Sequence, residues 1–178
     1  LLHPIVAPDA EKVATLLASG LPAGPGGATG RVVFTADDAV AWAARGEQVV
    51  LVREETNPED VAGMRAAVAI LTARGGMTSH AALVARGWGM CCIVGAGELE
   101  IDTPARQFSV GGHTVVEGDL VTLNGTAGKV YEGELPLIET DASSAYMSHF
   151  LSLCDQHRKL KVRTNADTPA DAQRALDF

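Results

Sequence analysis

The chain of 178 residues lacks the features that mark several special protein classes. It has no apolar run near the roughly 20 residues that cross a bilayer, and no signal peptide is visible. Lys and Arg number 14 against 22 Asp and Glu, so the net charge is -8. Because nucleic-acid backbones are bound by clustered Lys and Arg, this balance argues against nucleic-acid binding. We therefore expect a cytoplasmic protein with neither membrane nor nucleic-acid partners.

Cysteine is also scarce. Three cysteines, of which Cys91 and Cys92 are adjacent, do not make a disulfide framework, so we expect reduced thiols. The chain has no C-x-x-C motif and no paired histidines that could supply four zinc ligands, so we predict no metal site. The apolar setting of Cys91 and Cys92 instead predicts a buried strand.

The length and composition are typical of one well-buried domain with attachments. Hydrophobic residues make up 47% of the chain and charged residues 20%, as in ordinary globular proteins. The first residue is Leu1 rather than methionine, and the chain stops at Phe178 inside a helical pattern. We therefore expect it to be a piece of a longer protein.

One short segment concentrates the chemistry, and it runs Gly75-Gly76-Met77-Thr78-Ser79-His80-Ala81. The glycine pair permits a tight turn, and the alanine-rich stretch that follows predicts a helix ending at Arg86-Gly87. His80 then lies in the first helical turn, where unpaired N–H groups and the helix dipole favour an anion. This position suits a phosphorylated histidine.

The neighbours of His80 support that interpretation. Arg74 can clamp a phosphate, Thr78 and Ser79 can donate hydroxyls or cap the helix, and the Gly75–Gly76 backbone can approach the ligand closely. A histidine at a helix start often only caps or packs, but no purely structural turn needs all these features together. For Arg86 we favour a simple role, neutralising the negative end of the helix.

An acidic cluster lies upstream and consists of Glu54, Glu55, Glu59 and Asp60. These carboxylates could form a metal site, but we favour a solvated turn in which Asn57 caps and Pro58 opens the next helix.

The remaining pattern predicts an α/β domain. Helices are expected at Asp9–Ser19, Asp37–Arg45 and Glu59–Ala67, and strands at Arg31–Thr35, Val49–Val52 and Val68–Leu71. This alternation predicts a partly parallel sheet flanked by helices. Further short strands are expected at Phe108–Val110, Thr114–Val116, Leu120–Leu123 and Lys129–Tyr131, before a connecting helix at Ser143–Lys159.

The run Leu71–Gly89, continued by Cys91-Cys92 and Gly95, closely resembles the phosphohistidine segment of the pyruvate, phosphate dikinase family of PEP-utilising enzymes. Further stretches are similar to that family in the same order, namely 21–28, 52–60, 63–64, 160–162 and 165–169. In the related phosphoenolpyruvate synthases and Enzyme I proteins, arginine typically occupies the position of Met77, so Gly76-Met77-Thr78 favours the dikinases. One departure is Met90, where the dikinases often have lysine.

The resemblance implies a swivelling β/β/α phosphohistidine domain with flanking linker helices and with His80 exposed at its surface. Four segments are implied: 1–20 as the linker leaving an ATP-binding domain, 21–135 as the swivelling domain, 136–159 as a linker helix, and 160–178 as the truncated start of a C-terminal PEP/pyruvate-binding barrel.

The resemblance also implies an activity. The family interconverts ATP, phosphate and pyruvate with AMP, diphosphate and phosphoenolpyruvate. The histidine matching His80 takes the pyrophosphoryl group of ATP, gives its terminal phosphoryl to inorganic phosphate and carries the other to pyruvate. Residues implied to support it are Arg74, Gly75, Gly76, Thr78 and Ser79. The threonine matching Thr78 is a regulatory phosphorylation site in plant members, which makes Thr78 a candidate for such modification.

The cofactors and partners follow from the same resemblance. Mg²⁺ and a monovalent cation would be held by other domains, with no metal bound by this chain. The ATP-binding and PEP/pyruvate-binding domains of the same polypeptide would be its partners, in a homodimer, and the chain alone would not complete the reaction. Two alternatives stay open: the corresponding domain of a phosphoenolpyruvate synthase, or a non-catalytic phosphocarrier or binding module.

Overall fold

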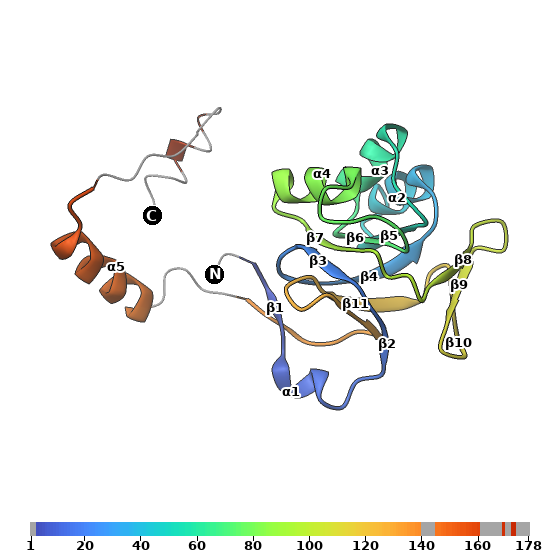
Figure 1. Cartoon of the computed structure of the whole chain (residues 1–178), viewed down its shortest axis with the longest axis horizontal. Coiled ribbons are helices and arrows are strands. Elements are labelled where there is room, and N and C mark those ends of the chain that lie inside the picture. The colour runs from blue at the N-terminus through green and yellow to red at the C-terminus, as the bar shows by residue number, and fades with distance from the viewer. Residues whose placement is uncertain (1–2, 140–144, 161–168, 170–171, 174–178) are drawn as a thin grey trace. The chain divides into compact units, whose positions relative to one another are not determined.

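A computed structural model describes residues 3–139, 145–160, 169 and 172–173. The chain divides into two compact units, residues 1–140 and 141–178. The first unit contains sheets and helices in alternation (Figure 1), which confirms the predicted α/β class.

Four parallel strands form the centre of the main sheet. They are β4 (Gly27–Val33), β5 (Val49–Arg53), β6 (Ala69–Thr72) and β7 (Cys91–Val94). The helices between them are α2 (Ala36–Ala43), α3 (Val61–Ala66, after the 3₁₀ turn η1 at Pro58–Asp60) and α4 (His80–Trp88). The predicted helix–strand alternation of this region is therefore confirmed.

Antiparallel strands extend the sheet on both sides, in the order β2-β12-β11-β4-β5-β6-β7-β3. The added strands are β2 (Leu16–Ser19), β3 (Leu21–Gly24), β11 (Leu120–Asn124) and β12 (Lys129–Glu132). Strands β2 and β3 lie at opposite edges of the sheet although only Gly20 separates them in the chain. The sheet must therefore curl until its two edges approach each other.

Apolar side chains form two buried clusters, one on each face of this sheet. One face packs against the helices through residues such as Val33, Leu51 and Ile70, with Ala82 of α4 on the opposite side. The other face packs against the antiparallel strands. Helices α2, α3 and α4 thus cover one side of the sheet, in a β/β/α arrangement (Figure 1).

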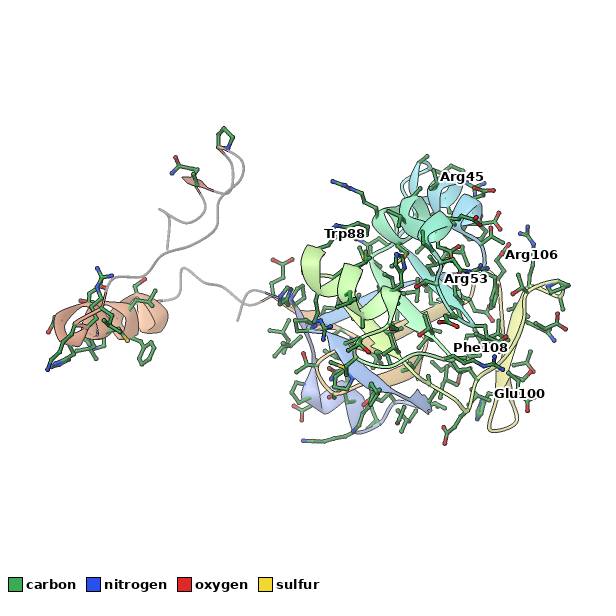
Figure 2. All side chains as sticks on the ribbon, turned by 45° about the horizontal axis from the view of Figure 1, so that its top comes forward. Arg45, Arg53, Trp88, Glu100, Arg106 and Phe108 are labelled. Atoms are coloured by element: carbon green, nitrogen blue, oxygen red, sulfur yellow. The ribbon has the colours of Figure 1, made fainter. Side chains whose placement is uncertain are left out.

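The smaller elements of the first unit attach at its margins. Strand β1 (Ile5–Val6) pairs with β13 (Leu137–Ile138), and α1 (Pro8–Glu11) follows β1. A separate antiparallel sheet contains β8 (Glu100–Asp102), β9 (Gln107–Val110) and β10 (His113–Val116). Phe108 fixes that sheet by an edge-on contact with Phe34 at 6.4 Å between ring centroids, and Arg106 pairs with Asp38 at 3.3 Å (Figure 2).

The predicted helix at Asp9–Ser19 is wrong. The helix stops at Glu11, and Leu16–Ser19 form β2, which pairs with β12. The apolar spacing of this stretch fits a helix, but Val13 is 87% exposed, whereas Leu17 and Ala18 are buried against the sheet. Pairing with the edge of the sheet thus overrides the local pattern. Residues 16–19 lie within the first unit.

Two other boundaries differ from expectation. The strand expected at Arg31–Thr35 begins earlier, as β4 at Gly27, and Leu21–Gly24 form β3, where no strand was expected. Helix α4 continues to Trp88 and ends at Gly89, whose φ of 64° is the left-handed conformation that glycine adopts easily.

The second unit contains α5 (Ala145–His157), close to the helix expected at Ser143–Lys159. Phe150 and Leu153 on this helix are exposed. The segment expected to start a barrel, 160–178, lies outside the described residues except for 160, 169 and 172–173. None of the helices in the described part of the chain is long and apolar enough to span a membrane.

We expect the thiols to differ in reactivity, because Cys91 and Cys92 are buried in β7 while Cys154 of α5 is exposed. Burial raises the pKa of both Cys91 and Cys92 to about 12, so neither is a thiolate near pH 8. Titration of the native chain with an aromatic disulfide reagent at pH 8 should modify Cys154 rapidly. The other two should react only after denaturation. Rapid modification of all three would contradict the buried placement of β7.

Gly125 marks a place where the curled sheet closes tightly. An added Cβ there would lie 2.1 Å from the Gly24 carbonyl oxygen and 2.8 Å from the Cys91 sulfur. We expect Gly125→Ala to lower the free energy of unfolding by about 1–3 kcal/mol, as overpacking does. Gly87→Ala on α4 is the control, because a Cβ there meets nothing within 4 Å. Denaturant unfolding measures both, and equal stabilities would contradict the tight closure.

Candidate functional site

The site lies where the carboxyl ends of β5 and β6 meet. The loop after β6 leads through residues 73–79 to α4, and the loop after β5 covers residues 54–57. The two loops are held side by side, because Ala73 N–H donates to the Arg53 carbonyl oxygen at 3.1 Å and Arg74 N–H to that of Glu54 at 2.8 Å. Ligands of α/β sheets commonly bind at such carboxyl ends.

The glycine turn before His80 is tight, as predicted. Gly75 has a φ of 110°, and a Cβ there would lie 3.0 Å from the Cβ of Ser79. The buried Thr72 hydroxyl donates to the Arg74 carbonyl oxygen at 2.6 Å, and Ser79 N–H donates to that of Gly76 at 2.9 Å. Hydrogen bonds from Thr72 and Ser79 therefore fix the backbone of the turn.

His80 is the first residue of α4, and Ser79 caps that helix. The Ser79 hydroxyl oxygen accepts a hydrogen bond from Ala82 N–H at 3.4 Å. His80 is partly buried, so its ring is held by the protein and still reaches the surface. The first N–H groups of any helix lack intrahelical partners, so the ring lies beside donors suited to an anion.

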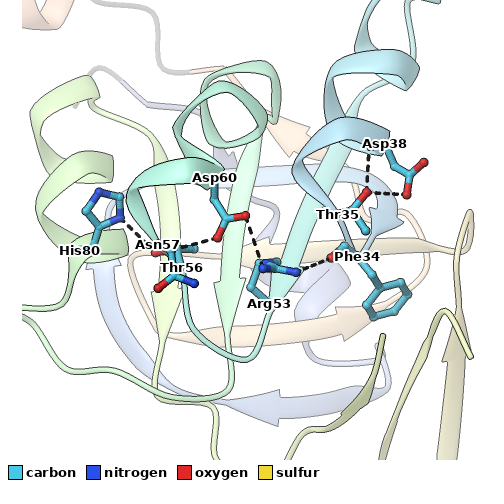
Figure 3. A network of polar contacts seen from close by, with 8 residues as sticks. All are labelled: Phe34, Thr35, Asp38, Arg53, Thr56, Asn57, Asp60 and His80. Carbon is cyan, nitrogen blue, oxygen red and sulfur yellow. Dashed lines mark hydrogen bonds and ion pairs between the residues drawn. The ribbon is translucent and has the colours of Figure 1, made fainter. Parts of the chain in front are cut away.

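Thr56 contacts the imidazole directly. Its hydroxyl oxygen lies 3.4 Å from Nδ1 of His80 (Figure 3), and its side chain is buried. Among the described residues, no hydrogen-bond partner is found for Nε2. Thr56 is not among the site residues expected from the sequence. The expected parallel order of β5 and β6 could have indicated it, since this order brings their following loops together.

The other expected site residues surround this turn. Arg74 is exposed and pairs with Glu54 at 3.0 Å, and Thr78 is exposed. Gly75 and Gly76 form the turn itself. The position of Arg86 in the last turn of α4 agrees with the expected role, but its guanidinium reaches back and donates to the Met77 carbonyl oxygen.

We expected the acidic cluster to be solvated, but one of its members is buried. Asp60 is buried, and its carboxylate accepts Asn57 N–H at 2.9 Å and pairs with Arg53 at 3.4 Å. Pro58 does open the next helical turn. Within the described ranges, no three His, Cys, Asp or Glu side chains gather as metal ligands, so the residues around His80 do not fit a resident metal.

The site lies in a range that is similar to a known family. Residues 45–128 match the family model of the PEP-utilising enzyme mobile domain, a range that contains both loops and α4. This match covers just under half of the chain.

Over nearly its whole length the chain is similar to pyruvate, phosphate dikinases. It is 52% identical to the enzyme of Clostridium symbiosum over 176 residues, which are 99% of this chain and 20% of that protein. It is 52% identical to dikinase 2 of Oryza sativa subsp. japonica over 97% of this chain and 19% of that protein. The chain thus spans about a fifth of the length of these relatives. A solved solution structure of Enzyme I aligns with 61% of this chain and 38% of its own, at 23% identity and a TM-score of 0.34.

The cap of α4 can be tested by Ser79→Ala. Loss of the hydroxyl acceptor leaves the Ala82 N–H without its partner, so we expect the free energy of unfolding to fall by about 1 kcal/mol. Thr35→Ala is a matched control, because the Thr35 hydroxyl caps α2 by accepting Asp38 N–H at 3.1 Å. Urea unfolding followed by circular dichroism measures both. An unchanged midpoint for Ser79→Ala would show that this cap contributes nothing.

Proposed function

We propose that this chain is the phosphotransfer domain of a pyruvate, phosphate dikinase, and that His80 carries the transferred groups. The observation that carries the proposal is the placement of His80. It begins α4 at the carboxyl edge of the sheet, with Nδ1 against the Thr56 hydroxyl. The chain around it is 52% identical in sequence to two pyruvate, phosphate dikinases.

The contact at Nδ1 makes Nε2 the attacking atom. The Nε2 lone pair attacks the β-phosphorus of ATP, an N–P bond forms, and the bond from that phosphorus to the oxygen bridging to the α-phosphorus breaks. AMP leaves with the bonding electrons. The terminal phosphoryl then passes to inorganic phosphate, giving diphosphate, and the remaining phosphoryl passes from Nε2 to the enolate oxygen of pyruvate. The covalent intermediate thereby divides one difficult exchange into easier steps.

The surroundings of His80 support the transferred group. The N-terminal N–H groups of α4 and the backbone of the Gly75–Gly76 turn would donate to phosphoryl oxygens. Arg74 would exchange its exposed ion pair with Glu54 for the incoming phosphoryl group. Ser79 fixes the first turn of the helix.

Thr78 is proposed as a modification site. Its side chain is exposed and lies two residues from His80. A phosphate on Thr78 would place two negative charges beside the nucleophile and repel incoming phosphate groups.

The rest of the reaction requires parts beyond this chain. Because the relatives are about five times longer, their remaining length would supply the nucleotide and pyruvate sites between which His80 travels. Mg²⁺ and a monovalent cation would be held in those parts, since the residues around His80 do not fit a metal. We propose a homodimeric, cytoplasmic enzyme, although some relatives are chloroplastic.

The test is labelling of the full-length gene product with ATP that carries ³²P at the β position. We expect acid-labile, alkali-stable label on the unsubstituted protein and none on His80→Ala, because the nucleophile is absent. His113→Ala is the control, since His113 lies on β10 in the separate sheet and should not affect labelling.

Label that persists in His80→Ala would refute the proposal. Product analysis separates the alternatives. Diphosphate formed from ATP and phosphate supports the dikinase, whereas release of free phosphate without diphosphate indicates a phosphoenolpyruvate synthase. Label without any transfer to pyruvate indicates a phosphocarrier.

A further inference from the structure

A buried ionic contact lies behind the Thr56 loop. Arg53, the last residue of β5, donates from Nη1 to the Phe34 carbonyl oxygen at 3.1 Å and pairs through Nη2 with Oδ1 of Asp60 at 3.4 Å. The second oxygen of Asp60 accepts Asn57 N–H at 2.9 Å. Figure 3 shows this chain of contacts running from the end of β4 to the imidazole of His80.

The contacts converge on the residue beside Thr56. Asn57 follows Thr56 in the chain, so a restraint on Asn57 N–H also restrains the peptide that carries the Thr56 side chain. Phe34 directly follows the last residue of β4, so its carbonyl group is fixed by the sheet. Arg53 therefore connects a strand end to the far part of the loop, beyond the backbone bonds that hold Arg53 and Glu54 to the β6 loop.

The burial of Asp60 makes this connection stiff. The residue is 5% exposed, and burial of a carboxylate is costly unless a cation and hydrogen bonds compensate it. Arg53 supplies the cation and Asn57 N–H a hydrogen bond. Removal of Arg53 would leave the Asp60 carboxylate buried without a cation. The carboxylate would then turn toward water, and its hydrogen bond from Asn57 N–H would break.

We propose that Arg53 and Asp60 are positioning residues for His80, which act by fixing the Thr56 hydroxyl at Nδ1 so that Nε2 is the nitrogen that accepts phosphorus. The inference rests on the proposed function, because it concerns the same histidine. The Thr56 contact of 3.4 Å is long for a hydrogen bond, so small movements of the loop decide whether it forms. A freed Nδ1 would compete with Nε2 for the phosphoryl group.

The choice of nitrogen can be measured on this chain without other domains, with phosphoramidate as the phosphoryl donor. A ring nitrogen attacks phosphorus, the N–P bond to histidine forms, and the P–N bond of phosphoramidate breaks with loss of ammonia. Nuclear magnetic resonance distinguishes the Nδ1 and Nε2 products. Signals missing from His80→Ala identify those of His80 among the other histidines.

We expect the Nε2 product to dominate in the unsubstituted chain. Thr56→Val should raise the ratio of Nδ1 to Nε2 product about fivefold, the change that loss of one typical hydrogen bond produces. Arg53→Gln and Asp60→Asn should each raise the ratio in the same direction. Adding either one to Thr56→Val should cause no further rise, because both act through Thr56.

Arg31→Gln is the matched control. Arg31 on the neighbouring strand β4 also pairs with one carboxylate, Glu47 at 3.0 Å, and donates to one carbonyl oxygen, that of Gly118 at 2.8 Å. Its loss should leave the product ratio unchanged. Amide spectra of each variant verify the fold, and either Arg53→Gln or Asp60→Asn suffices if the other does not fold.

An unchanged ratio in a folded Arg53→Gln or Asp60→Asn chain would overturn the inference. So would an unchanged ratio in Thr56→Val, or an equal shift in Arg31→Gln. None of these results bears on ATP-dependent labelling of His80, which tests the proposed function separately.

Discussion

The parallel pairing of β5 and β6 is the constraint on which the candidate site depends. Their register continues past the strand ends through the bonds from Ala73 and Arg74 to the backbone of the β5 loop. These bonds bring together two loops that are some twenty residues apart in the chain. One loop carries Thr56 and the other leads to His80, so the imidazole and its hydroxyl partner meet only because the strands run in the same direction.

The position of α4 depends in turn on small side chains. Its buried face consists of Ala81, Ala82 and Ala85, and the helix packs on β3, β6 and β7. Alanine permits a close approach of the helix to the sheet, and close packing leaves a helix little freedom to shift. Because His80 precedes this face directly, the packing that anchors the helix also fixes the height of the ring above the sheet. In the proposed function, His80 is thus presented from a rigid base.

The sequence predicted the parts of the fold whose signal is local. The α/β alternation from Arg31 to Val94 follows from buried apolar runs and clear turn residues, and the glycine turn follows from the glycines themselves. Strands β2 and β3 were missed because they are short edge strands that owe their conformation to partners far away in the chain. Thr56 was missed for the same reason, since its contact spans 24 residues. The burial of Asp60 depends on Arg53, a pairing that composition does not reveal.

The pairing of charges explains how an acidic chain can offer a site to phosphate. With a net charge of -8, the molecule as a whole repels anions, and the four acids of the upstream cluster lie on the loop beside His80 and the turn that follows it. Two of the four are matched by a cation, because Glu54 is paired with Arg74 and Asp60 with Arg53. The two pairs differ in exposure: Arg74 lies at the surface, whereas Asp60 is buried. Water screens the outer pair, so Arg74 can leave Glu54 for a phosphoryl group at small cost, while the inner pair stays fixed. In the proposed function, the arrangement therefore separates binding from positioning, with Arg74 free to move and Arg53 held in place.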